Sequence, residues 1–136
     1  MKAQIDENLP PALARALNAI AAIDEHEVVH VTDFAKGAPD LDLFKRAIEH
    51  GVRVHITQDH HQRRPVEREA IAKLGLIVFV LAKGWNKMEH YQKAAWLIEW
   101  WPKIMQAAEL YARGTIHRVP HCSARSGRLE QIKDKH

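Results

Sequence analysis

One uninterrupted apolar run constrains the fold of this 136-residue chain more than any other stretch. Residues 76–82 read LIVFVLA, with no polar or charged side chain among them. A strand that is apolar along its whole length has to be buried on both faces, which is typical of the centre of a parallel sheet covered by helices. The run therefore predicts an α/β protein with a mostly parallel central sheet.

Extended and helical segments alternate around this run. Extended patterns cover residues 2–6, 26–34 and 52–57, and TIHRV at 115–119 favours a last strand; helical patterns cover 9–23, 40–51, 65–75 and 87–114. Such alternation predicts right-handed crossovers, with helices on both faces of a sheet of four to five strands. In the first helical segment Leu13, Leu17 and Ile20 share one face, and Asp40 stands where an N-cap would cap the second.

Composition and cysteine usage exclude several classes of protein. Hydrophobic residues make up 46% of the chain and charged residues 27%, close to the globular average. No apolar run approaches the roughly 20 residues of a membrane span, and MKAQIDENLP at the start lacks an apolar signal segment. The single Cys122 excludes an internal disulfide framework and multi-cysteine zinc sites. We therefore expect a cytoplasmic protein with no membrane partner.

Charge divides the chain into two parts. Residues 113–136 contain six basic and two acidic side chains, a net charge of +4, which leaves 14 basic and 15 acidic side chains, a net of −1, in residues 1–112. We expect a domain over 1–112 followed by a basic C-terminal extension over 113–136. Such a tail can hold a polyanion, although a solvated terminus explains the same composition.

Acidic side chains follow or precede the predicted elements at one edge of the sheet. Asp6 ends the first strand, Asp59 follows the third, and Asp40 opens the helix after the second. Ligands of open α/β sheets bind outside the carboxyl ends of the strands, where all three would meet. Converging carboxylates repel one another unless a cation is present, and an oxygen-only set suits Mg²⁺ or Mn²⁺. Each acid alone also has a structural interpretation, as a helix cap or a turn residue.

The same segments resemble a known family. The stretches IDENLPPALARAL, HEVVHVTDF and GAPDLDLFKRAIEHGVRVHITQD are similar to PIN-like proteins, relatives of VapC-type toxin ribonucleases. The similarity covers residues 2 to 82, through a DENLP opening, a GAxD before the second helix and a T-x-D after the third strand. It implies a three-layer α/β/α PIN-like sandwich, cleavage of RNA with Mg²⁺ or Mn²⁺, and neutralisation by an antitoxin, which in this family is a small helix-turn-helix protein.

The resemblance also implies roles for individual residues. Asp6, Asp40 and Asp59 match the catalytic, metal-binding carboxylates of the family, whereas Asn8 and Thr57 match polar supports. Relatives usually carry a second aspartate two residues after the first, in the pattern T-x-D-x-D-F. Here the window reads TQDHHQ, so His61 occupies that position. A histidine can bind Mn²⁺ but removes one negative charge, which weakens a Mg²⁺ site.

Two arginines follow the histidine. Guanidinium groups of Arg63 and Arg64 at the mouth of a carboxylate site would hold RNA phosphates, although a solvated loop before Pro65 explains them equally. The sequence therefore supports a metal-dependent toxin ribonuclease, or alternatively a non-catalytic PIN-like module that binds RNA or protein through a degenerate acidic site.

Four tryptophans have two interpretations. Trp96 and Trp100 are four residues apart on one predicted helix, as are Leu97 and Trp101, so each pair stacks along that helix. Core packing explains this spacing most simply, whereas an exposed tryptophan face would favour a homodimer.

Overall fold

The computed structural model describes residues 1–33, 39–59 and 64–133. Its strands are β1 (Lys2–Ile5), β2 (Glu27–His30), β3 (Val54–Thr57), β4 (Ile77–Leu81), β5 (Ile116–Val119) and β6 (Glu130–Ile132). Its α-helices are α1 (Pro11–Ala21), α2 (Asp40–Glu49), α3 (Pro65–Leu74) and α4 (His90–Leu110), joined by 3-10 turns η1 (Ala22–Asp24), η2 (Val31–Asp33) and η4 (Lys83–Lys87). No helix in the described ranges combines the length and apolar character that crossing a bilayer requires.

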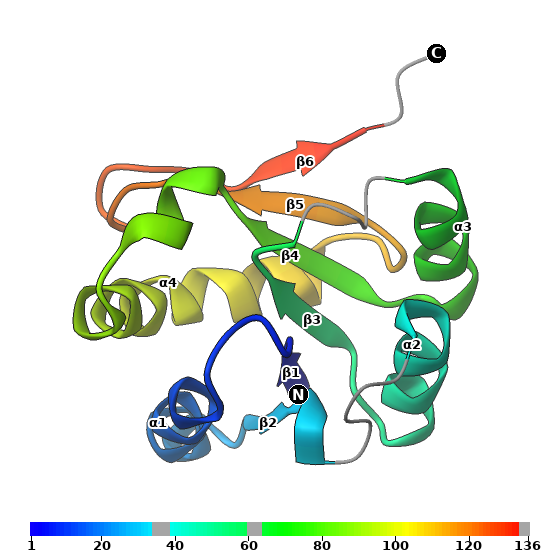
Figure 1. Cartoon of the computed structure of the whole chain (residues 1–136), viewed down its shortest axis with the longest axis horizontal. Helices are drawn as coiled ribbons and strands as arrows, with labels where there is room; N and C mark the ends of the chain where they lie inside the picture. The colour runs from blue at the N-terminus through cyan, green and yellow to red at the C-terminus, as the bar shows by residue number, and fades with distance from the viewer. Residues whose placement is uncertain (34–38, 60–63, 134–136) are drawn as a thin grey trace.

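The strands form a single mostly parallel sheet in the order β2-β1-β3-β4-β5-β6 (Figure 1). All neighbouring pairs are parallel except β5 and β6, which are antiparallel. The prediction from the apolar run is confirmed, because every residue of β4 is buried. The sheet has six strands in the described chain, more than the four to five predicted. The strand predicted at 115–119 is present as β5, and the basic segment over 113–136 adds the unpredicted β6, where Arg118 pairs with Glu130 at 3.6 Å.

Helices cover both faces of the sheet, so the predicted three-layer arrangement is confirmed (Figure 1). On one face α1 and α4 pack on Ile5, Ile56 and Phe79. On the other face α2 and α3 pack through Phe44 and Ile71 against the opposite side of the same strands. This division follows from the period of two along a strand, which sends successive side chains to opposite faces.

Two details of the helices differ from the prediction. Ile20, expected on the buried stripe of α1, is 53% exposed, because Leu13, Ala14, Leu17 and Ala21 form the face that packs. Pro39 occupies the N-cap position of α2, so Asp40 is the first helical residue rather than the cap.

The tryptophans belong to the core. Trp85, Trp100 and Trp101 are buried, and Trp96 packs its ring edge-on against Trp85 with ring centroids 5.7 Å apart. The indole nitrogens of Trp85 and Trp100 donate to the carbonyls of Pro120 and Cys122, which connects the segment between β5 and β6 to η4 and α4. Core packing is therefore the correct interpretation of the tryptophan spacing.

Strand β2 forms one edge of the sheet, and side chains occupy its outward amides. Val28 donates its backbone N–H to Asn18 Oδ1 at 2.9 Å, and His30 donates its own to Asp33 Oδ2 at 3.0 Å. The N–H of Glu27 points the other way and donates to the Met1 carbonyl, on the chain that enters β1. Both outward donors of this edge strand are thus satisfied within the chain.

Candidate active site at the carboxyl edge of the sheet

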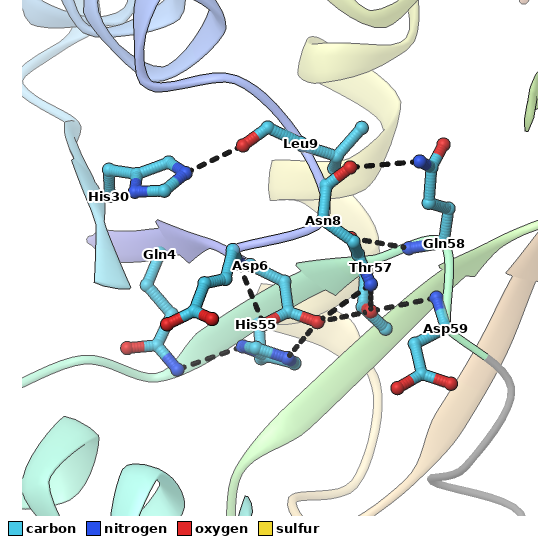
Figure 2. A network of polar contacts seen from close by, with 10 residues as sticks. Gln4, Asp6, Asn8, Leu9, His30, His55, Thr57, Gln58 and Asp59 are labelled. Atoms are coloured by element: carbon cyan, nitrogen blue, oxygen red, sulfur yellow. Dashed lines mark hydrogen bonds and ion pairs between the residues drawn. The ribbon is translucent and has the colours of Figure 1, made fainter. Parts of the chain in front are cut away.

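The carboxylate of Asp6 is buried at the carboxyl edge of the adjacent strands β1 and β3. Its Oδ1 accepts a hydrogen bond from the Glu7 N–H at 2.8 Å, and its Oδ2 accepts from Thr57 Oγ1 at 2.6 Å and Asn8 Nδ2 at 3.0 Å (Figure 2). The register of the strands explains this meeting, because Ile5 pairs with Ile56 and the next residue of each strand follows at the same edge. Asp6 is only 8% exposed, so three donors compensate for the burial of its charge.

Thr57 connects this carboxylate to the loop that carries Asp59. Its hydroxyl donates to Asp6 and accepts from the Asp59 N–H at 2.9 Å and from Asn8 Nδ2 at 3.2 Å. A hydroxyl has one donor and two acceptor positions, so all of its hydrogen-bonding capacity is used. The geometry therefore brings together four of the predicted site residues, Asp6, Asn8, Thr57 and Asp59, in what we term the rim network.

A histidine lies beneath the rim network on the α2 side of the sheet. His55 is fully buried, its Nδ1 lies 2.8 Å from Gln4 Nε2, and its Nε2 lies 3.9 Å from Asp6 Oδ2 (Figure 2). The ring also meets Phe44 edge-on, with centroids 5.5 Å apart. Sequence reasoning missed Gln4 and His55. The available signal was a polar residue in the middle of each of two apolar strands.

A second histidine fixes the loop from the other side. His30 Nε2 lies 2.7 Å from the Leu9 carbonyl, which can only accept, so this nitrogen carries the proton (Figure 2). Its Nδ1 lies 2.7 Å from the Thr32 hydroxyl oxygen and 3.2 Å from the Thr32 backbone nitrogen. His30 thereby ties the loop that carries Asp6 and Asn8 to strand β2.

Gln58, between Thr57 and Asp59, holds the same loop on its outer side. Its Nε2 donates to the Asn8 carbonyl at 2.9 Å (Figure 2), and its Oε1 accepts from Lys93 Nζ of α4 at 3.1 Å. Sequence reasoning missed both residues. For Lys93 the signal was its position, because it falls on the same helical face as the buried Leu97 and Trp100.

The other predicted site residues have different outcomes. Asp40 begins α2, and a helix that follows a strand begins at the carboxyl edge, but its side chain is outside the described part of the structure. His61 and Arg63 also lie outside the described residues. Arg64 is exposed at the N-cap of α3.

The described residues supply oxygen ligands suited to a hard divalent cation. Asp6 uses three of its roughly four acceptor positions within the protein, which leaves a lone pair for a ligand. Asp59 adds a half-buried carboxylate on the adjacent strand end. Among the described side chains no group of three histidine, cysteine or acidic residues is spaced to hold a metal. Carboxylate oxygens are the ligand type that Mg²⁺ and Mn²⁺ accept, in sites that use one or two carboxylates and keep several waters.

Comparison with known proteins identifies a family for most of this region. A family model described as a PIN-like domain matches residues 1–83, the segment from the N-terminus through β4. The matched segment contains all residues of the rim network and the helices α1, α2 and α3. Helix α4, which carries Lys93, lies outside it. No curated protein and no solved structure matches the chain.

Proposed function

Because the chain belongs to the family of PIN-like domains, whose fold is of the nuclease type, we propose that it is a metal-dependent ribonuclease and the toxin of a toxin–antitoxin pair. The observation that carries the proposal is the buried Asp6 carboxylate, oriented by three donors and linked through Thr57 to Asp59. Aspartate is rarely buried in proteins, and a buried carboxylate oriented by three donors favours a functional site over a turn residue.

In the proposed site Asp6, Asp40 and Asp59 hold Mg²⁺ or Mn²⁺. The bound ion would polarise the scissile phosphate and lower the pKa of a bound water. The other residues of the proposed site orient the metal-binding carboxylates and neutralise the phosphates of the RNA. Thr57 and Asn8 fix the orientation of the Asp6 carboxylate through their hydrogen bonds. The guanidinium groups of Arg63 and Arg64 bind phosphates of the RNA backbone. Two features support RNA as the substrate: the resemblance to VapC-type ribonucleases and the arginines that follow the third strand.

The proposed partner is a cognate antitoxin. The support is the family resemblance alone, which favours a small helix-turn-helix protein. Co-expression with a candidate of that kind should relieve growth inhibition by the chain, and purification of the pair should give a stable complex. Growth inhibition in the absence of any catalytic activity would contradict the toxin ribonuclease and favour a binding module.

The experiment that tests the proposal is cleavage of a mixed cellular RNA pool by the wild type and by Asp59→Asn, with Mg²⁺, Mn²⁺ or EDTA. We expect cutting with either metal, none with EDTA, and a large loss in the variant. Asp42→Asn is the matched control, because Asp42 is an exposed aspartate on α2. RNA binding without cleavage by the wild type would contradict the ribonuclease. Cleavage gained on His61→Asp would then identify a non-catalytic module whose acidic site has degenerated.

A further inference from the structure

Two charged side chains other than histidine are buried in the described part of the chain, Asp6 and Lys93. Asp6 belongs to the rim network. Lys93 is the fourth residue of α4, ten residues beyond the end of the family match, and is 9% exposed. The buried anion and the buried cation therefore come from separate parts of the chain.

Hydrogen bonds connect these two charges through the loop between them. Lys93 Nζ donates to Gln58 Oε1 at 3.1 Å, and Gln58 Nε2 donates to the Asn8 carbonyl at 2.9 Å. Asn8 Nδ2 then donates to Asp6 Oδ2 at 3.0 Å. Each of these hydrogen bonds is donated from the lysine side toward the carboxylate side, and the covalent bonds of Asn8 join the last two.

The position of Lys93 is costly for a residue that only packs. The side chain lies on the apolar face of α4, and no carboxylate oxygen of the described residues lies within 4.0 Å of Nζ. Burial lowers the pKa of the ammonium below 10.5, which expresses the penalty for its charge. A leucine or methionine would fill the same space without that penalty, so stability does not explain the lysine.

We propose that Lys93 is a positioning residue that acts through Gln58 to fix the loop at residues 6–9, and with it the Asp6 carboxylate, against Asp59. Helix α4 is thereby part of the site, although it lies outside the segment that defines the family. The effect on RNA cleavage rests on the proposed function, whereas the effect on the loop does not.

The test compares Lys93→Met with Lys103→Met. Lys103 lies on the same helix and also donates to a neutral oxygen, the Ala124 carbonyl, but it is not connected to the rim network. Nuclear magnetic resonance follows the Asn8 side-chain amide and the exchange of the Leu9 N–H, which donates to the Asp6 carbonyl. For Lys93→Met we expect a shifted Asn8 amide, faster Leu9 exchange and an unchanged or raised melting temperature. Lys103→Met should change neither signal.

In the cleavage assay Lys93→Met should lower kcat by up to about 10-fold with KM unchanged, the lower end of the loss typical when a direct partner of a metal ligand is removed, because Lys93 acts on Asp6 through Gln58 and Asn8. A double mutant tests whether the effect of Lys93 passes through Gln58. If Lys93 acts through Gln58, Lys93→Met adds nothing in a Gln58→Met background.

The outcomes separate this inference from the proposed function. An unchanged Asn8 amide and unchanged Leu9 exchange in Lys93→Met would overturn the positioning role, whatever the RNA assay shows. So would effects of Lys93→Met and Gln58→Met that simply add, or a lowered melting temperature with an unaltered loop. A wild type that fails to cut RNA would remove the proposed function, while a shifted loop in Lys93→Met would still support the positioning role.

Discussion

Two regions of the sheet bury polar side chains, and they do so in opposite ways. In the rim network, at the ends of β1 and β3, polar atoms bond to one another, and Thr57 alone makes three hydrogen bonds. In β5, His117 is also buried, but it stacks between Phe79 and Tyr111 with ring centroids 5.4 and 4.6 Å away. The first region orients a charge, whereas the second removes a neutral ring from water.

The hydrogen bonds of His117 show the difference. The Thr115 hydroxyl donates its proton to the Ala112 carbonyl at 2.7 Å, so it accepts from His117 Nε2 at 2.8 Å. His117 Nδ1 has no hydrogen-bond partner in the described structure. Desolvation by burial lowers the pKa of this ring to about 4. Polar groups that are linked at strand ends thus indicate a site, and a single polar group among aromatic rings indicates packing.

The largest effect should come from removing the charge at the centre of the rim network. Asp6→Asn keeps an acceptor for Thr57 but removes the anion, so RNA cleavage should fall on the order of a thousandfold while the fold persists. Initial rates with Mg²⁺ and the melting temperature measure the two quantities. Full activity in this variant would show that the linked carboxylate is structural.

His117 should control stability rather than activity. The folded ring binds its proton only near pH 4, whereas the unfolded ring binds it near pH 6.5, so stability is lost as the pH falls from about 6.5 to about 4. In the wild type this ring should lower the free energy of unfolding by up to about 3 kcal/mol between pH 7 and pH 4. His117→Phe should remove that loss, and urea unfolding at the two pH values measures it.

The matched control for this variant is His90→Phe, at an exposed position at the start of α4. The pH dependence of the free energy of unfolding should change more in His117→Phe than in this control. If the free energy of unfolding fell by the same amount between pH 7 and pH 4 in the wild type and in His117→Phe, burial would not hinder protonation of the ring.

Thr57→Val isolates the hydrogen bonds of the rim network, because it removes one hydroxyl and changes the side-chain volume little. The change removes a donor to Asp6 and an acceptor for the Asp59 and Asn8 N–H groups. We expect a loss of about 2 kcal/mol in the free energy of unfolding and roughly tenfold slower cleavage. Thr115→Val, the matched change beside His117, should lower stability without altering the cleavage rate per folded molecule.

The smallest effect is expected for Arg64→Ala. The side chain is exposed at the start of α3, so its removal should leave stability unchanged. Loss of one phosphate contact should reduce the slope of log affinity against log salt by about 0.7 for single-stranded RNA. Arg15→Ala, an exposed arginine on α1, provides the control. The same slope in both variants would exclude Arg64 from the RNA interface.

Much of the fold was predictable because its signals are local. The apolar run identified β4, and alternation of strand and helix patterns gave the layers. Strand β6 was not predictable, since it is three residues long with only Ile132 buried, and its pairing with β5 determines it. Ile20 was misplaced because α1 ends at Ala21, and alanines at positions 14 and 21 complete the face that packs.

The site was predictable only where its residues end strands. Asp6, Asn8, Thr57 and Asp59 follow or close β1 and β3, so the topology alone brings them together. Gln4 and His55 could not be paired from the sequence, because 51 residues separate them and neither ends a strand. Lys93 reaches Gln58 across 35 residues through the packing of α4, which no local pattern specifies.

The occupied edge of β2 restricts how a partner protein can bind. A peptide that joins the sheet as an additional strand needs the outward N–H groups of Val28 and His30, and Asn18 and Asp33 already hold both. The incoming backbone would have to displace two side chains before it gained a hydrogen bond. Inhibition of this protein by strand addition next to β2 is therefore disfavoured, and a partner that binds through helices meets no such barrier.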